Sequence, residues 1–289
     1  MSSAIETTPI VLRDIEDTAE MRAVEDLQIE AWEDAERDIV PLNQLAAARH
    51  VGGTLIGAFA GEVLAGFVYG FYGHVHGQII HHSHMLAVHS AYRNYNLAFR
   101  LKLAQRDRVL AESLTDRITW TFDPLQSLNA HFNFGKLGAV SGTYKINVYG
   151  EAGTSFLHQN GTDRFFVTWL LRSPRVIKRI SERPLRSPGF DIPTQKILPL
   201  IRCSDSGAPE LNPSDADFSG SEFALVEIPT DINAIEESDF STARRWRLET
   251  RRVFSETFAA GFIVTNYSRR DEKIGTYLLE KKRLEDCIE

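Results

Sequence analysis

Apolar side chains recur along this sequence with two different periods, and the switches between them mark the predicted elements. Met21, Val24 and Leu27 lie about one helical turn apart, behind a capping-box spacing that begins at Asp17. Farther along, runs rich in β-branched and aromatic residues predict strands, and Gly61 predicts a hairpin turn between two of them. Up to residue 122 the expected elements are a strand at 10–12, helices at 17–31 and 41–48, strands at 54–60, 63–72 and 80–89, a helix at 97–114 and a strand at 117–122.

The pattern continues to residue 171 with a short helix at 126–138 and strands at 139–150 and 163–171. Helices and strands follow one another in an order that predicts a mixed α/β sheet. Seven of the eleven prolines then fall between residues 172 and 221. For this segment we expect an extended connection with little regular structure.

Regular patterning returns at residue 222. A strand there precedes a long helix, which is capped by Asp239 or Ser241 and ends at Gly261, and a closing hairpin follows. Because a strand, a helix and a hairpin are too small to fold alone, we expect this element to dock on the first domain. The predicted division is a domain at 1–172, a Pro/Ser-rich connecting segment at 173–221 and a C-terminal α/β element at 222–289.

Composition and charge narrow the class of protein. At 289 residues the chain can bury a large core, and its hydrophobic and charged fractions are ordinary for a soluble globular protein. A net charge of −7 argues against a nucleic-acid partner, and no apolar run reaches the length of a membrane span. The N-terminus lacks the pattern of a signal peptide, and two distant cysteines, Cys203 and Cys287, form no disulfide framework. The expected location is the cytoplasm.

Four histidines fall within one predicted strand, in the stretch HHSHMLAVH. Because successive strand residues point to opposite faces, His82, His84, Leu86 and Val88 are expected on one side. An unperturbed pKa of about 6.5 suits histidine to act as a general base near neutral pH. Partial burial beside apolar neighbours favours the neutral form that this role requires.

A turn and a helix follow this strand directly. The unpaired backbone amides at a helix N-terminus bind phosphate, and Arg93 adds a fixed positive charge at the same place. Asn94 and Asn96 tolerate left-handed backbone conformations that turn the amides of a loop inward, although glycine adopts them at less cost. Strand, turn and helix therefore line up histidines, an apolar strand edge and a cradle for an anion.

This arrangement resembles the GNAT superfamily of acyl-CoA-dependent N-acyltransferases. The signature of that family, Gln/Arg-x-x-Gly-x-Gly/Ala, opens the helix after the fourth strand and binds the CoA pyrophosphate; here it is Arg93-x-x-Asn96-x-Ala98. The resemblance implies a mixed, mostly antiparallel central sheet flanked by helices, with the C-terminal strand-helix-hairpin element appended, and acyl-CoA as co-substrate without a metal. The residues expected at the acyl-CoA are Leu86, Ala87, Val88, Arg93, Asn94, Tyr95, Asn96, Leu97 and Ala98, with Asn129 and Asn133 either at the pantetheine or capping a helix.

The stretch HSHMLAVH is also similar to the fourth strand of the serotonin (arylalkylamine) N-acetyltransferase family. Two alternate histidines in that family relay the proton of the attacking amine to water. By this resemblance His82 and His84 form the relay, and the backbone from Leu86 to Val88 binds the pantetheine and the thioester carbonyl.

One position departs from the pattern of the family. Where many GNAT enzymes place a tyrosine that protonates the leaving thiolate, this chain has Phe134. Either the thiolate leaves unassisted, or Tyr144 or His131 replaces the tyrosine. Phe134 and Asn96 support an alternative function, an inactive GNAT-like module that binds acyl-CoA as a sensor or scaffold. The histidine pair argues against it, because a module that only binds needs no proton path.

Nearly the whole chain resembles a bacterial GNAT branch of predicted acyltransferases, on stretches such as TWTFDPLQSLNAHFNFGKLGA and WRLETR. Some members accompany N-acylamino acid racemases, which implies transfer of an acetyl or succinyl group to an amino acid. Arginines would hold the carboxylate of such an acceptor. The candidates are Arg164, at the start of a strand, and Arg244, Arg247 and Arg251, on a helix face opposite Trp246. The alternative for the three helix arginines is that they are solvated or paired with glutamates. The sequence leaves a homodimer open.

Six histidines between residues 74 and 89 make a metal site a further alternative, since imidazole is a common metal ligand. No carboxylate lies between Glu62 and Asp107 to complete such a site locally. The histidines outside the relay pair are expected to be packed, solvated or in a loop, and they are His74, His76, His81 and His89.

Overall fold

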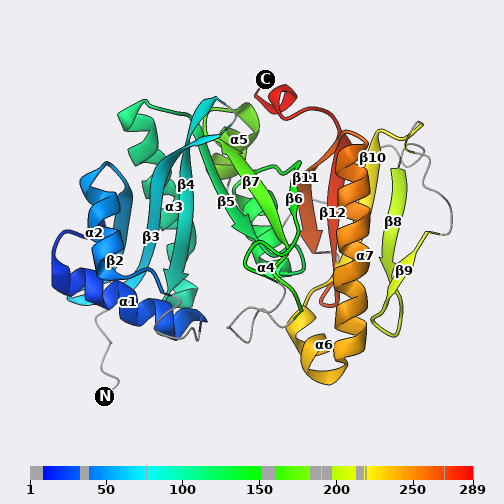
Figure 1. Ribbon diagram of the computed structural model, residues 1–289, viewed down its shortest axis with the longest axis horizontal. Coiled ribbons are helices and arrows are strands. Elements are labelled where there is room, and N and C mark those ends of the chain that lie inside the picture. Colours follow the sequence, from blue (N-terminus) through cyan, green and yellow to red (C-terminus); the bar gives the residue numbers. More distant parts are fainter. Residues whose placement is uncertain are drawn as a thin grey trace, which may run out of the picture. The chain divides into compact units, whose positions relative to one another are not determined.

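The protein is described by a computed structural model with two compact units (Figure 1). The described residues up to Ile118 belong to the first unit and those from Thr119 to the second, so that the division falls within strand β5 (Arg117–Phe122). The structure describes residues 9–32, 39–75, 77–150, 160–182, 190, 197–212, 218, 220–269 and 271–288. His76 therefore lies outside the described residues.

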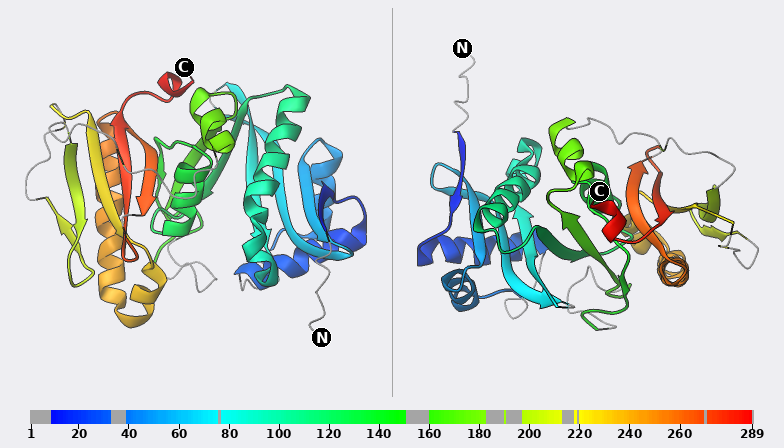
Figure 2. Two further views of the ribbon diagram at one scale, coloured as in Figure 1. Left: turned by 180° about the vertical axis from the view of Figure 1, so that it is seen from behind. Right: turned by 90° about the horizontal axis from the view of Figure 1, so that it is seen from above.

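In the first unit, strands β1 to β4 are neighbours in chain order and pair antiparallel. Helices α1 and α2 cover one face of these strands and α3 covers the other (Figure 2). Gly61, at φ +64°, forms the tight turn between β2 and β3, which confirms the predicted hairpin. The elements are β1 (Ile10–Asp14), α1 (Thr18–Trp32), α2 (Leu42–His50), β2 (Thr54–Ala60), β3 (Val63–Val75), β4 (Gln78–Val88), the 3-10 helix η2 (Ser90–Tyr95) and α3 (Leu97–Glu112).

The core of this unit has two layers, one on each face of the sheet. Met21, Val24 and Leu27, the residues whose spacing predicts α1, are buried against Phe67 and Tyr69 of β3. We call this layer the α1–α2 layer. The layer on the other face, which we call the α3 layer, contains the buried residues Ile56, Ala58, Ala65, Val68, Leu97 and Leu101.

In the second unit, strand β7 lies between β5 and β6, and a second sheet has the strand order β11-β12-β10-β8-β9. Strand β10 pairs antiparallel with β12 and parallel with β8, so this sheet is mixed. Helix α7 lies along one face of it (Figure 1). Besides β5, the elements are α4 (Ser127–Ala130), the π-helix η3 (His131–Lys136), β6 (Tyr144–Lys145), β7 (Arg164–Leu170), α5 (Pro174–Glu182), β8 (Ile197–Cys203), β9 (Pro209–Leu211), β10 (Phe223–Pro229), α6 (Ile232–Ser238), α7 (Phe240–Ala259), β11 (Phe262–Arg269), β12 (Ile274–Lys281) and the 3-10 helix η6 (Glu285–Cys287).

The predicted mixed α/β class with a further C-terminal sheet is confirmed, and so is Asp239 as the cap of α7, because its carboxylate accepts the backbone N–H of Thr242 at 3.1 Å. The strand expected at 139–150 is wrong for most of its length. Only Tyr144–Lys145 pairs as a strand, and Asn147 turns the chain with φ 48°.

The expectation of little regular structure between residues 172 and 221 is also wrong, since α5, β8 and β9 lie there. Two of the prolines occupy the first positions of elements, Pro174 in α5 and Pro209 in β9. At those positions the missing backbone N–H of proline breaks no internal hydrogen bond. The predicted division at residues 172 and 221 stays a prediction.

Candidate functional site

Strand β4 does not alternate regularly along its whole length. Tyr69 of β3 pairs with Met85, but the next residue, Gly70, pairs with Ser83. His84 is therefore an extra residue on β4, which defines a β-bulge. Beyond a bulge, the side chains of a strand lie on the faces opposite to those that strict alternation predicts.

The expectation that His82, His84, Leu86 and Val88 share one face is wrong for this reason. Leu86 and Val88 pack in the α3 layer. The rings of His82 and His84 lie 5.9 Å and 5.8 Å from the ring of Phe71, which packs against the α1–α2 layer. The bulge thus keeps the two histidines on one face and turns Leu86 and Val88 to the other.

The two imidazoles form a pair with their ring centroids 6.4 Å apart. His82 is half-buried and His84 is exposed. Burial, followed by the charges of His84 and Lys102, lowers the pKa of His82 to about 4. Burial alone lowers the pKa of His84. Burial therefore favours the neutral form of both rings.

The turn after β4 has the predicted left-handed backbone at Asn96, whereas Asn94 lies in the 3-10 helix η2 without it. Asn96, with φ 55° and ψ 29°, adopts the left-handed conformation at the start of α3. Arg93 is exposed within η2, and Leu97 is buried beneath the first turn of α3. The other predicted residues of this stretch are Asn94 and Tyr95, which are exposed, Ala98, which is half-buried, and Ala87, which is buried in β4.

His89 and Glu30 fix the start of this turn. The Nδ1 atom of His89 accepts the backbone N–H of Ala91 at 3.2 Å, and its Nε2 atom lies 3.3 Å from the carboxylate of Glu30. That carboxylate also accepts the backbone N–H and the hydroxyl of Ser90, at 3.2 and 2.9 Å. These bonds, the hydroxyl first, lower the pKa of Glu30. His89 therefore has a structural role that its position in the sequence did not indicate.

A buried polar cluster on the other face of β4 was not predicted from the sequence. The ammonium of Lys102 donates to the hydroxyl of Ser83 at 2.8 Å and to the side-chain oxygen of Gln105 at 3.3 Å. Gln105 donates to Thr54 at 3.3 Å, and that hydroxyl lies 3.1 Å from Nε2 of His81. The signal in the sequence was the pair of polar residues three positions apart on the otherwise apolar inner face of α3.

The predicted CoA residues of the second unit differ in exposure. Asn129 is exposed on α4, whereas Asn133 is buried in η3, because a π-helical turn rotates successive residues less than an α-helical turn. Phe134 is fully buried, with its ring 5.8 Å from Phe122 and 5.9 Å from Tyr277. It belongs to an aromatic cluster of this unit.

The two candidates to replace the missing tyrosine are poor acids at neutral pH. The hydroxyl of Tyr144 donates to Asp163 at 2.8 Å, and burial raises the pKa of Tyr144 well above its ordinary value. Burial, followed by the charges of Lys136 and two arginines, lowers the pKa of His131 to about 4, so its ring is neutral. Their role in protonating a thiolate stays a prediction.

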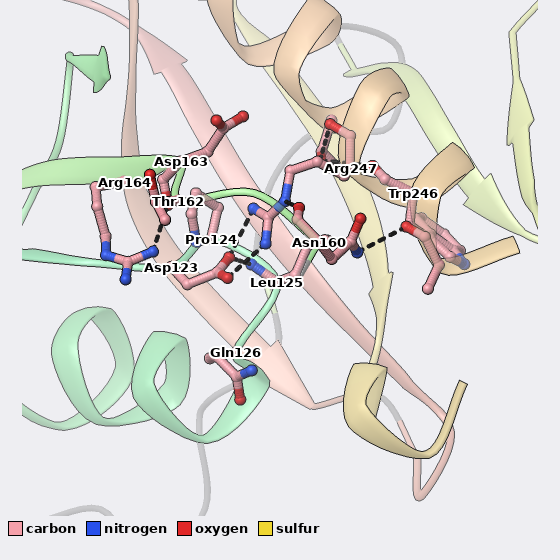
Figure 3. A network of polar contacts seen from close by, with 12 residues as sticks. Asp123, Pro124, Leu125, Gln126, Asn160, Thr162, Asp163, Arg164, Trp246 and Arg247 are labelled. Carbon is pink, nitrogen blue, oxygen red and sulfur yellow. Dashed lines mark hydrogen bonds and ion pairs between the residues drawn. The ribbon is translucent and has the colours of Figure 1, made fainter. Parts of the chain in front are cut away.

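Arg247 is fully buried beside Trp246, so its expected place on the opposite face of α7 is wrong. Two of its nitrogens donate to the two oxygens of Asp123, at 2.8 and 2.5 Å (Figure 3). Its Nε donates to the carbonyl of Asn160 at 2.9 Å. A guanidinium can enter the interior here because a carboxylate from the end of β5 neutralises it in a bidentate geometry.

Arg251 forms a second pair of this kind, with two nitrogens 2.8 and 2.9 Å from the oxygens of Asp163. Two of the four predicted arginines therefore already hold carboxylates of the chain. Half-buried Arg164 donates to the carbonyl of Asp163 at 2.9 Å, and its guanidinium lies 5.3 Å from the ring centre of Tyr149. Arg244 is exposed.

The predicted residues thus fall into two groups. The histidine pair, the strand edge and the anion cradle belong to the first unit, and the two asparagines and four arginines to the second. Within the described ranges, no three histidine, cysteine, aspartate or glutamate side chains gather so that they could hold a metal ion. In the same part of the chain, no helix is long and apolar enough to cross a membrane.

Comparisons with known proteins return acetyltransferases. No protein-family model and no curated protein matches the chain. The chain is similar to the solved structure of an N-acetyltransferase from Staphylococcus aureus, with 12% identity and a TM-score of 0.45, over 56% of this chain and 99% of that chain. It is also similar to an acetyltransferase of the GNAT family from Streptococcus pneumoniae, with 16% identity and a TM-score of 0.42, over 55% and 98%. Aminoglycoside 6'-acetyltransferase type Ii gives 15% identity and a TM-score of 0.45, over 56% and 97%.

The Arg247–Asp123 pair makes a prediction about stability. Replacing Arg247 by Met leaves a carboxylate largely buried without its partner, which costs about 3–5 kcal/mol in the free energy of unfolding. Arg252→Met is the matched control, because Arg252 lies on the exposed side of the same helix and pairs with Glu249 and Glu256. Its loss should be below about 1 kcal/mol. Urea unfolding measures both, and similar losses would contradict the prediction.

The histidines of β4 predict loss of stability in acid. Burial first, and then the charge of Lys102, lowers the pKa of His81 to about 3, while that of His82 falls to about 4. Between these values and the unfolded pKa of about 6.5, the unfolded chain binds more protons, so stability falls as the pH falls through this range. At pH 5 each histidine should reduce the free energy of unfolding by roughly 2 kcal/mol.

The measurement is urea unfolding at pH 7 and pH 5, with His81→Gln compared with the unsubstituted protein. The variant should lose less stability between the two pH values, whatever its stability at pH 7. An unchanged difference between pH 7 and pH 5 would show that the ring of His81 does not titrate in this way.

Proposed function

We propose that the protein is an acyl-CoA-dependent N-acyltransferase, which moves an acetyl or succinyl group to the primary amine of an amino acid. The amine attacks the thioester carbonyl directly, the carbon–sulfur bond breaks and CoA leaves as the thiolate. The proton lost by the amine passes through the histidines to water. No covalent intermediate with the enzyme is needed.

One observation carries this proposal: a single stretch of the first unit, from β4 through η2 into α3, holds both the histidine pair proposed as the base and the residues proposed as the anion cradle. His82 and His84 supply neutral imidazoles at pH 7. A few residues farther on, Arg93 and the left-handed Asn96 open a helix whose first backbone amides suit a phosphate. A base and a phosphate site on one stretch of the chain suit a substrate that carries both a thioester and a pyrophosphate.

The two histidines divide the work of proton transfer by their surroundings. His84 is exposed, so it is the ring that delivers the proton to water. His82 is half-buried, which lowers its pKa to about 4, and it extends the path along the strand. A ring with a pKa of about 4 holds a proton only briefly, which suits a relay better than a resting base.

Thiolate departure proceeds without the usual tyrosine in this proposal. Phe134 is buried among aromatic rings and has no proton to give. A thiol has a pKa of about 8.5 in its ordinary state, so a thiolate is a tolerable leaving group near neutral pH.

The amino-acid acceptor is the finer part of the proposal. Arg247 and Arg251 hold Asp123 and Asp163 within the second unit. Arg164 and exposed Arg244 of the same unit stay the predicted residues for a carboxylate. Burial lowers the pKa of Arg164, yet it remains charged at neutral pH, and a desolvated guanidinium binds a carboxylate strongly.

A thiol-release screen that crosses acetyl- and succinyl-CoA with amino acids and arylalkylamines tests the proposal. Thiol release with phenylalanine above that with phenethylamine supports an amino-acid acceptor, and the reverse preference would place the enzyme with arylalkylamine acyltransferases. Binding of CoA without thiol release for any amine would favour the alternative, a sensor or scaffold.

The relay predicts a pH-dependent loss of activity. His82→Ala and His84→Ala should each reduce turnover at pH 7 by about 10²–10⁴-fold, the usual contribution of general-base assistance. Affinity for acyl-CoA should change little, and activity should partly return at high pH, where free amine is abundant. Turnover at pH 7 equal to that of the unsubstituted protein in both variants would exclude the relay.

The anion cradle predicts which part of CoA loses affinity. Arg93→Ala should weaken binding of CoA more than binding of pantetheine, which lacks the pyrophosphate. Asn96→Gly should keep or improve CoA affinity, because glycine adopts a φ of 55° at less cost. Isothermal titration with both ligands provides the comparison, and equal losses on Arg93→Ala would place the phosphates elsewhere.

A further inference from the structure

The ring of Phe71 on β3 lies beside both imidazoles of the histidine pair. Its centroid is 5.9 Å from that of His82 and 5.8 Å from that of His84. Tyr69, two residues earlier on the same strand, lies 5.9 Å from Phe71 and edge-on to His84 at 6.0 Å. Phe71 is half-buried and His84 is exposed. An amine that reaches this pair therefore also lies close to the ring of Phe71.

The same face of β3 continues with a residue that has no side chain. Successive strand residues alternate between faces, so Gly73 follows Phe71 on one side of β3. Phe71 pairs with His82 and Gly73 pairs with Ile80. Among the described residues, only Cγ1 of Ile80 lies within 4.0 Å of the position that a β-carbon of Gly73 would occupy. Within the described part of the first unit, the space next to Phe71 is therefore open.

Strand β2 does not extend along this part of the hairpin. Its pairing with β3 ends where Thr54 lies opposite Gly70. Phe71 and Gly73 therefore belong to the part of the β3–β4 hairpin that projects beyond β2.

No local cause within the described residues accounts for a glycine at position 73. Glycine weakens a strand, and there it often marks a left-handed φ, a bulge, or the close approach of a ligand or another backbone. Gly73 has no left-handed φ, and it lies outside the register shift next to Gly70. A β-carbon at Gly70 would collide with the ring of His81, whereas one at Gly73 would collide with none of the described residues. The approach of a ligand is the cause that remains.

We propose that Phe71 and Gly73 determine the acceptor of the reaction, and that this acceptor carries an aromatic side chain. The ring of the acceptor packs against Phe71, Gly73 leaves the room for it, and the amine meets His82 and His84. This inference rests on the proposed function, because it names the acceptor class of the same site.

The surroundings favour an aromatic side chain over a small or a charged one. Aromatic rings attract one another in offset or edge-to-face arrangements, in addition to the gain from burying their area. A small side chain such as that of alanine buries less apolar area and gains less. Phe71 and Met85 are both partly buried apolar residues packed against the α1–α2 layer, and a charged side chain would lose hydration beside them.

Gly73→Val tests the space beside Phe71. Because Gly73 has no left-handed φ and valine is favoured in strands, the variant should fold. The measurement is thiol release with phenylalanine and with alanine as acceptors. The ratio of kcat/KM for phenylalanine to kcat/KM for alanine should fall about 10-fold or more, the scale on which an apolar site discriminates by size.

Phe71→Leu tests the ring, because leucine keeps an apolar side chain and removes the aromatic contact. The same ratio should fall roughly 3- to 10-fold, which corresponds to the attraction between two rings. Val63→Ala is the control, since Val63 is exposed at the opposite end of the same strand, and it should leave the ratio unchanged. An unchanged ratio in Gly73→Val would overturn the proposal. A loss that is equal for both acceptors leaves the ratio unchanged, and it would overturn the proposal as well.

These outcomes separate the inference from the proposed function. Thiol release with an unchanged ratio in Gly73→Val would retain the acyltransferase and exclude this acceptor class. Absence of thiol release with every amine would exclude the proposed function. Isothermal titration of phenylalanine into the CoA-saturated protein then decides the inference: weaker binding to Gly73→Val would support a place for a ring beside Phe71, and equal or absent binding would overturn it.

Discussion

Strand β4 has one residue more than strand β3 can pair, and the place of that residue decides what each face of the sheet contains. Because the bulge falls at His84, both histidines of the pair lie beside Phe71 and the α1–α2 layer, and Leu86 and Val88 pack under α3. A bulge one residue earlier or later would exchange the two faces at a different residue. The α3 layer, the histidine pair and the lysine behind it all depend on this single irregularity.

The first unit shows which features local sequence can predict. Its strands and helices were predicted because their periods are local, and the left-handed Asn96 follows from a residue type that tolerates that conformation. The bulge was not predictable, since it is defined only by pairing with β3. Gly70 is the residue of β3 next to the bulge, and a β-carbon there would collide with the ring of His81.

The second unit was predicted less well because its charges pair over long distances in sequence. The arginines of α7 carry no local sign of burial, and each partner aspartate precedes its arginine by a wide interval. The same strand order also occurs twice within this unit. Strands β5 and β10 are each followed by a helical segment and then by two antiparallel strands, of which the second pairs with β5 or β10. The resulting orders are β5-β7-β6 and β10-β12-β11. The prediction of little regular structure from the proline content of residues 172–221 failed because Pro174 and Pro209 stand at the first positions of α5 and β9.

The two ion pairs of α7 also determine when the second unit can complete its folding during translation. Arg247 and Arg251 lie 124 and 88 residues after their partners, Asp123 and Asp163. At about 5–20 residues per second, a ribosome exposes those aspartates for several seconds before their arginines emerge. The described helices and strands that lie wholly in the first unit all precede residue 119 and can pair during that interval. Nascent chains stalled shortly before residue 247 would therefore hold a folded first unit and a second unit still open to proteases and chaperones.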